Sequence, residues 1–139
     1  MNAQKRILVV SRDSLILQTR KLMLGAYFDV SAAGRVIEAR MLLADQTFDL
    51  IVLCYTLSES DCRIIDNAAQ ERCSHAKILM VTGYGYPASK AVTYLQLAAE
   101  EGPFTLVKKS AELLGFEFRS KGRLVRALAP DMITASSSA

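Results

Sequence analysis

The sequence contains few of the residues that usually build metal centres or disulfide frameworks. It has a single histidine, His75, and three cysteines at scattered positions among 139 residues. An odd number of scattered cysteines forms no disulfide framework, and neither they nor the histidine have the spacing of a zinc site. We therefore expect no metal and no cofactor, and the cysteine usage indicates a reducing cytoplasm.

Long apolar runs and a strong charge imbalance are also absent. Residues 1–6 lead into only four apolar residues, too few for the core of a signal peptide or for a membrane span. Lys and Arg outnumber Asp and Glu by only 17 to 14, a net charge of +3. Charge of this size predicts neither a nucleic-acid nor a membrane partner. We expect a cytoplasmic protein.

The sequence also lacks motifs for catalysis. Ser11, Ser58 and Ser60 are not in the glycine-flanked turn that presents a hydrolase nucleophile. Residues 83–85, Gly-Tyr-Gly, lack the Gly-Lys ending of a phosphate-binding loop. No other nucleophile has a base near it in the sequence, so we expect no enzyme.

What the chain does have is a set of short apolar runs. Hydrophobic residues make up 51% of it, enough to bury the core of one domain. The run 48–54 is short enough for a strand and too continuous for a half-exposed one, which predicts a buried strand in a parallel sheet. Polar residues 55–61 follow at once. Cys54 is therefore expected at the carboxyl end of a central strand, the edge at which open α/β sheets bind ligands.

Similar runs alternate with segments of helical periodicity. We expect strands at 7–10, 27–31, 48–54, 78–81 and 104–107, and helices at 15–25, 36–44, 60–72, 88–100 and 119–129. Asp13 or Ser14 caps the first helix, and Pro130 stops the last, for which residues 111–114 are an alternative start. One domain over 1–129 and a disordered polar tail at 130–139 are expected.

Strands and helices that alternate in this way predict an α/β fold with helices on both faces of the sheet. The expected architecture is a three-layer, flavodoxin-like sandwich with five parallel strands in the order 2-1-3-4-5.

Four segments within about residues 5–110 also resemble the receiver domains of two-component response regulators, the CheY-like superfamily. They are Lys5–Val10, Phe48–Leu53, Lys77–Gly83 and Leu106–Lys108. The resemblance assigns them to the first, third, fourth and fifth strands of that family. It makes Thr82 the switch hydroxyl and Lys108 the lysine that reads the phosphoryl group.

The chain departs from that family where its chemistry lies. Receivers hold Mg²⁺ with an acidic pair after the first strand, and Ser11 and Arg12 stand there instead. A hydroxyl and a guanidinium do not supply the oxygen ligands that Mg²⁺ requires. The phosphoacceptor position is Cys54, whose soft thiol binds Mg²⁺ poorly and forms no acyl phosphate. The resemblance therefore implies a degenerate pseudo-receiver.

By this resemblance, the protein is a stand-alone signalling module that binds a sensor kinase or an output protein without aspartyl phosphorylation. The expected partner face comprises Lys90, Tyr94, Leu97 and Thr105. Two alternatives stay open. One is an anion or small-ligand sensor with a cationic sheet edge made by Arg12, Lys108 and Lys109. The other is a receiver phosphorylated at a different acid, such as Asp13 or Asp61.

Three individual residues each allow two interpretations. Arg12 either binds an external anion or replaces the metal by pairing with Asp13 or Glu59. Cys54 is either an inert core residue or a reactive thiol, and the absence of a nearby histidine favours the inert one. Thr82 either keeps a switch role or only bonds its own loop.

Overall fold

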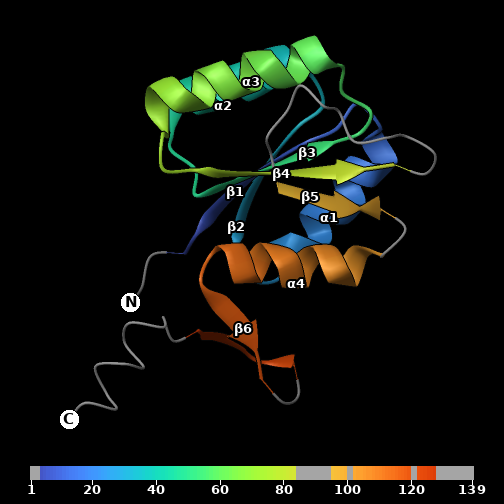
Figure 1. Ribbon diagram of the computed structural model, residues 1–139, viewed down its shortest axis with the longest axis vertical. Coiled ribbons are helices and arrows are strands. Elements are labelled where there is room, and N and C mark those ends of the chain that lie inside the picture. Colours follow the sequence, from blue (N-terminus) through green and yellow to red (C-terminus); the bar gives the residue numbers. More distant parts are fainter. Residues whose placement is uncertain (1–3, 84–94, 100–101, 120–121, 128–139) are drawn as a thin grey trace.

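The predicted fold is confirmed by a computed structural model, which describes residues 4–83, 95–99, 102–119 and 122–127. Five parallel strands form a sheet in the order β2-β1-β3-β4-β5 (Figure 1). The elements in chain order are β1 Arg6–Val10, α1 Ser14–Gly25, β2 Asp29–Ala33, α2 Val36–Asp45, β3 Leu50–Cys54, α3 Glu59–Arg72, β4 Lys77–Thr82, β5 Leu95–Ala98, α4 Pro103–Leu113, β6 Phe116–Phe118 and β7 Leu124–Arg126.

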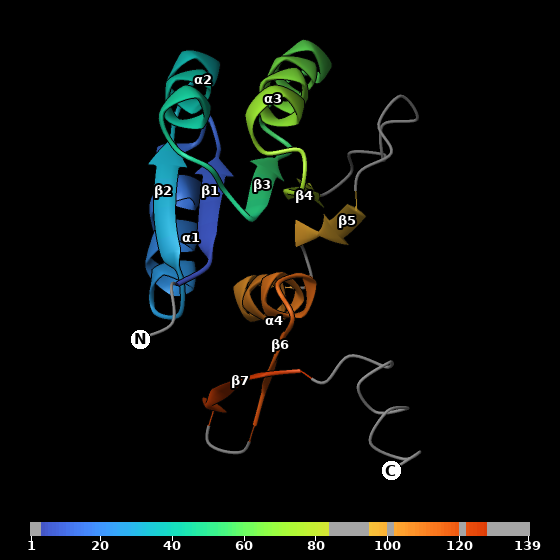
Figure 2. The same cartoon turned by 90° about the vertical axis from the view of Figure 1, so that its left-hand side faces the viewer.

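Helices cover both faces of the sheet. Helices α2 and α3 lie side by side over one face, and α1 and α4 lie over the other (Figures 1 and 2). Successive residues of a strand point to opposite faces, so Leu8 and Val10 pack under α2 and α3 while Ile7 and Val9 pack under α1 and α4. All five residues of β3 are buried, as the continuous apolar run predicted. No helix in the described part of the chain is long and apolar enough to cross a membrane.

Side-chain caps fix the start of two helices. The Asp13 Oδ1 atom accepts hydrogen bonds from the backbone N–H groups of Leu15 and Ile16, 2.9 and 3.0 Å away, so Asp13 is the cap of α1. Ser58 and Asp61 form a reciprocal capping box at the start of α3. Both caps lie at the carboxyl edge of the sheet, where they order the loops that follow β1 and β3.

The fifth strand is not where the apolar run at 104–107 predicted it. That run belongs to α4, and β5 is formed instead by Leu95–Ala98, within a segment predicted to be helical. Gly102, with φ at 92°, and Pro103 at the first helical position begin α4. The buried residues of α4 recur at helical spacing, as Leu106, Val107, Ser110 and Ala111. The rest of the predicted 88–100 helix, other than residues 95–99, lies outside the described residues.

The predicted final helix at 119–129 is also wrong in its described part. A hairpin of β6 and β7 follows α4, with Gly122 in the left-handed region at φ 71°. The hairpin lies beneath α4 in Figure 2 and is tied to the core by rings, because Phe118 packs on Tyr27 and Phe104. Alternation of Phe116, Glu117 and Phe118 was the available strand signal. Pro130 and the predicted tail lie outside the described residues.

Candidate functional site

The carboxyl ends of the central strands bring together three of the residues predicted to share one edge. Strand β1 ends next to β3, with Val10 opposite Leu53, so Ser11 follows β1 beside Cys54. Cys54 in turn is opposite Val81, one residue before Thr82. Ser11, Cys54 and Thr82 therefore lie at the carboxyl ends of adjacent parallel strands, as expected for an edge that holds a functional site.

Lys108 is not part of this edge, which corrects the sequence prediction. It lies within α4 with its side chain exposed, because the segment that was expected to end a strand there is a helix. Lys109 is on the same helix, and its Nζ atom is 3.9 Å from a carboxylate oxygen of Glu112. Strand β5 ends in Ala98, which is opposite Thr82. The proposed cationic edge of Arg12, Lys108 and Lys109 is therefore not assembled.

A hydroxyl network joins the loop after β1 to the loop after β3. The Ser11 side chain is fully buried, and its Oγ atom accepts a hydrogen bond from the Asp13 N–H at 3.1 Å. The same oxygen is 3.4 Å from the Thr56 hydroxyl, which accepts a 3.0 Å hydrogen bond from the Arg12 N–H. Thr56 therefore connects the two loops at the positions where a receiver would hold its metal. No sequence motif had pointed to Thr56.

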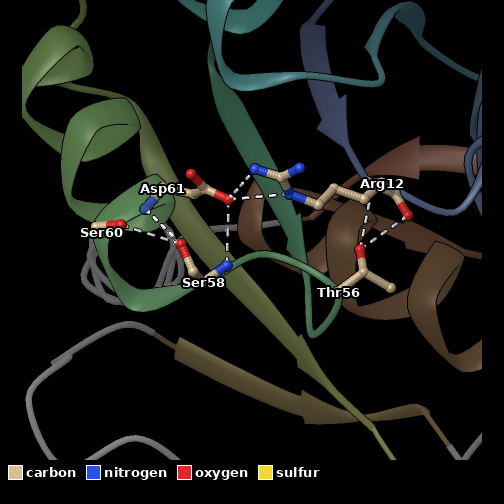
Figure 3. Close-up of polar contacts among 6 residues, drawn as sticks. Arg12, Thr56, Ser58, Ser60 and Asp61 are labelled. Atoms are coloured by element: carbon tan, nitrogen blue, oxygen red, sulfur yellow. Dashed lines mark hydrogen bonds and ion pairs between the residues drawn. The ribbon is translucent and has the colours of Figure 1, made fainter.

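Arg12 forms the strongest link across the site. Its Nη2 and Nε atoms donate hydrogen bonds to the same oxygen of Asp61, at 2.7 and 3.0 Å (Figure 3). That oxygen also accepts the Ser58 N–H at 3.3 Å. Arg12 thus ties the loop after β1 to the first turn of α3, as an internal counter-charge was expected to do. Its partner is Asp61, however, and not the predicted Asp13 or Glu59.

The surroundings of Asp61 favour its charged form. Burial raises the pKa of Asp61, but the Arg12 hydrogen bond, those from the Ser58 backbone and hydroxyl, and the Arg12 charge more than offset it and lower the pKa below its usual value. The Asp61 carboxylate is therefore already paired. Asp13, the other candidate acid, is used as the cap of α1. In the described part of the chain, no cluster of His, Cys, Asp and Glu could hold a metal ion.

Cys54 is shielded from solvent yet has an environment that favours the thiolate. Its exposed fraction is 0%. Burial raises its pKa, but hydrogen bonds from the Ser11 and Thr56 hydroxyls, from the Thr56 backbone and the charge of Arg20 outweigh burial, so the pKa is lowered. For Cys62, burial and then the charges of Asp61 and Glu59 raise the pKa to about 11. Although both cysteines are buried, the surroundings of Cys54 favour the thiolate and those of Cys62 favour the neutral thiol.

Thr82 and Gly83 pack against neighbouring elements. The Thr82 hydroxyl is 3.4 Å from the Leu97 carbonyl oxygen of β5, to which it donates, so among the described residues it bonds the adjacent strand. The loop after Gly83, to which a bond was the other interpretation, lies outside the described residues. A Cβ atom at Gly83 would lie 2.6 Å from ring carbons of Tyr55. The Tyr55 ring therefore lies directly against the backbone that leaves β4, and only glycine leaves room for it.

The predicted partner face is only partly described. Lys90 and Tyr94 lie outside the described residues. Leu97 is a core residue, 8% exposed, because it points from β5 toward the layer of α1 and α4. Thr105 is half-buried on α4 and not on a strand, and it already has an interaction within the chain. Leu97 is therefore removed from the candidate surface residues.

Two features of this part of the molecule had only weak sequence signals. The spacing of Ser58 and Asp61 is that of a capping box, which could have identified Asp61 as a structural acid. Arg20 is buried on α1 together with Leu17 and Leu24, so it falls at a core position of the helical period. A cation at a core position was visible in the sequence, but its surroundings were not.

No family model and no curated protein matches the chain. Among solved structures, a CheY-like receiver domain protein from Methanospirillum hungatei JF-1 is similar, with a TM-score of 0.68, 25% identity and coverage of 81% of this chain and 94% of that chain. The chemotaxis protein CheY4 of Vibrio cholerae gives 0.67 and 21%, over 80% of this chain and 99% of that one.

A third similar structure has the same fold. The signal receiver domain of an HD domain-containing protein from Pseudomonas fluorescens Pf-5 has a TM-score of 0.67 and 21% identity, and coverage is 80% of this chain and 94% of that chain. These likenesses extend over nearly the whole length of the solved domains. The protein therefore has the fold of a CheY-like receiver domain.

Proposed function

We propose that this protein is a degenerate receiver-like signalling module that binds a protein partner without aspartyl phosphorylation. Its partner would be a sensor kinase or an output protein, the classes with which receiver domains interact. The fold supports the signalling role. The residues at the carboxyl edge of the sheet support the loss of the phosphoryl switch. Structural roles account for these residues, so no enzymatic activity is proposed.

The observation that carries this proposal is the ion pair of Arg12 with Asp61. A divalent ion in a receiver is held with an acidic pair after the first strand, whereas here a guanidinium at that place ties the loop after β1 to the first turn of α3. Arg12 brings a positive charge to a place where a second cation would be repelled, and Mg²⁺ retains its hydration unless oxygen ligands replace it. Cys54 adds no carboxylate. The loops are thus held in one arrangement without metal or phosphoryl group.

A receiver phosphorylated at another acid is less well supported. Asp61 already accepts hydrogen bonds from Arg12 and Ser58, and Asp13 already caps α1, so phosphorylation of either acid would compete with a structural role. Each reaction would also have to proceed without a built Mg²⁺ site to neutralise the incoming oxygens. The anion sensor at a cationic edge is not supported either, because Arg12 is paired and Lys108 lies on α4.

The decisive experiment is phosphorylation by acetyl phosphate with Mg²⁺, read by intact mass spectrometry. The unmodified protein should gain no phosphoryl group, and neither should Cys54→Asp, because that variant restores the acceptor but not the metal ligands. The triple variant with Ser11→Asp, Arg12→Asp and Cys54→Asp should bind Mg²⁺ and be phosphorylated at least weakly. Phosphorylation of the unmodified protein would contradict the proposal, and Asp13→Asn and Asp61→Asn would then identify the acceptor.

Partner binding needs a separate test. We expect the affinity for a captured partner to be the same with and without acetyl phosphate and Mg²⁺, because one loop arrangement is present throughout. A several-fold rise in affinity on adding the donor would refute constitutive binding. Lys90→Glu and Tyr94→Ala should weaken the complex if the predicted face is correct. Arg40→Glu, at an exposed position on α2, is the matched control.

A further inference from the structure

A cavity of about 280 Å³ lies between α1 and the start of α4. It is separate from the Arg12 and Asp61 ion pair and draws on none of its residues. Its walls are mostly apolar, with contributions from both helices and from the end of β5. The lining residues are Leu15, Ile16, Thr19, Arg20, Ala99, Gly102, Pro103 and Leu106.

The unusual member of this lining is Arg20. Only 8% of the residue is exposed, since it occupies the inward side of α1 between Leu17 and Leu24. Its Nη1 atom is buried and has no hydrogen-bond partner among the described residues. A guanidinium is always charged, and burial of a charge without a partner is strongly unfavourable. A buried arginine is therefore normally paired with an acid or with a bound anion.

The described residues supply no such acid. The acid–base contacts seen among them each use another basic residue, namely Arg6, Arg12, His75, Lys109 or Arg119. The Thr19 hydroxyl, the other polar side chain of the lining, is already a donor to the Leu15 carbonyl oxygen at 2.8 Å. Arg20 is therefore a buried cation beside an apolar cavity, and no carboxylate of the described residues pairs with it, although its charge contributes to the lowered pKa of the Cys54 thiol.

We propose that this cavity binds a small organic carboxylate, with the carboxylate at Arg20 and an apolar body against the two helices. The fork of an arginine side chain matches the two oxygens of a carboxylate. The walls favour an apolar body, because pockets for small molecules combine an apolar lining with a few polar groups that fix orientation. Inorganic phosphate fits less well, since it would leave most of its oxygens against apolar walls.

The size of the cavity is consistent with this ligand class. An apolar cavity of about 150 Å³ is large enough to bind benzene. The cavity beside Arg20, at about 280 Å³, therefore has room for a ring and for a carboxylate attached to it. Binding would supply the missing counter-charge and fill the apolar space together. This inference does not depend on the proposed signalling function, because it uses none of the residues at the carboxyl edge.

Isothermal titration calorimetry with benzoate as the probe tests the proposal, with benzamide and inorganic phosphate as comparisons. Benzoate should bind at least tenfold more tightly than benzamide, which has the same shape without the charge, and at least tenfold more tightly than phosphate. Arg20→Met should lower benzoate affinity at least tenfold. Arg40→Met, at an exposed position on α2, is the matched control and should leave affinity unchanged.

A second variant protects the test against a folding defect in Arg20→Met. Ala99→Leu keeps the cation and fills part of the cavity, so it should also abolish benzoate binding. Absence of benzoate binding to the unmodified protein, equal affinity for benzamide, or full affinity in Ala99→Leu would each overturn the proposal. Glu100 and Glu101 stand in the sequence between two lining residues. If only a variant with both changed to glutamine bound benzoate, the chain's own acids would be the counter-charge and the proposal would be wrong.

Discussion

The ion pair between Arg12 and Asp61 should make a measurable contribution to stability, and its removal is the sharpest test of the site. The perturbation is a double-mutant cycle with Arg12→Met, Asp61→Asn and the double variant. Methionine keeps most of the apolar stem of Arg12, and asparagine keeps an oxygen that can accept the Ser58 N–H. The cycle therefore isolates the charged interaction from packing and from the capping box.

The expected size follows from the burial of the two partners. The Asp61 side chain is 12% exposed, whereas that of Arg12 is 53% exposed, so the pair is half-way between a surface and a buried ion pair. Exposed pairs contribute about 0.2–1 kcal/mol, and loss of one partner from a buried pair costs about 3–5 kcal/mol. We expect a coupling free energy of about 1–2 kcal/mol and a loss of about 2 kcal/mol in Arg12→Met, which leaves a shielded carboxylate unpaired.

The contribution should depend on pH in a defined direction. The folded-state pKa of Asp61 is lower than its usual value, because pairing with Arg12 and Ser58 outweighs burial. A group with a lowered folded pKa stabilises the protein above its unfolded pKa, about 3.9, and the contribution is lost as the pH falls through the folded value. The coupling should therefore be complete near pH 7 and should decrease below about pH 4.

Urea unfolding at several pH values, with the free energy of unfolding taken from linear extrapolation, gives the required numbers. The matched control is the surface pair Arg119–Glu117, with side chains 59% and 48% exposed, which should couple by less than about 0.5 kcal/mol. A coupling between Arg12 and Asp61 no larger than that of the control, or one that does not change between neutral and acid pH, would refute the reasoning.

Two further predictions concern access and packing at the same edge. Alkylation of native Cys54 by iodoacetamide, followed by mass spectrometry, should be slow, because the exposed fraction of Cys54 is 0%. The reaction should accelerate with denaturant, which removes this shielding from a thiol whose lowered pKa favours reaction. Rapid labelling of Cys54 ahead of Cys62 and Cys73 in native protein would instead indicate a redox-active thiol. Gly83→Ala should lower the free energy of unfolding by about 1–3 kcal/mol, since its Cβ would lie 2.6 Å from the Tyr55 ring. Gly25→Ala is the control, because an added Cβ there has nothing within 4 Å, and it should not lower the free energy of unfolding. If Gly83→Ala lowered the free energy of unfolding by the same amount in a Tyr55→Ala background, the ring contact would be excluded as the cause.

The sequence alone determined the inner part of the sheet and the start of the first helix. The runs 7–10, 48–54 and 78–81 are apolar on both sides of the strand, which occurs only where helices cover both faces, and they became β1, β3 and β4. The strand order was predicted correctly as well, and Asp13 is one of the two residues predicted as the cap of α1. These features depend on local chemistry that a short window of sequence contains.

The position of the fifth strand was decided by tertiary structure. Residues 95–98 and 104–107 are both short and mostly apolar segments, and periodicity cannot tell a buried strand from part of a buried helix at that length. The edge of β4 pairs with Leu95–Ala98, while Gly102 and Pro103 start a helix that packs beside α1. Lys108, which the sequence had assigned to the site, directly follows residues 104–107 and therefore lies on α4. The Gly-Pro pair before these residues was the local signal that favoured a helix.

For the site as well, the sequence determined some features and the packing of the helices determined the others. Sequence alone determined which residues the carboxyl edge receives after β1 and β3, namely Ser11, Arg12 and Cys54, because register follows from the apolar runs. The packing of α1, α3 and α4 around the sheet decides which acid Arg12 meets. It also buries the Arg20 Nη1 atom beside a cavity with no hydrogen-bond partner in the described part of the chain. Side chains distant in sequence meet only when these layers are assembled, so no local pattern contains their pairing.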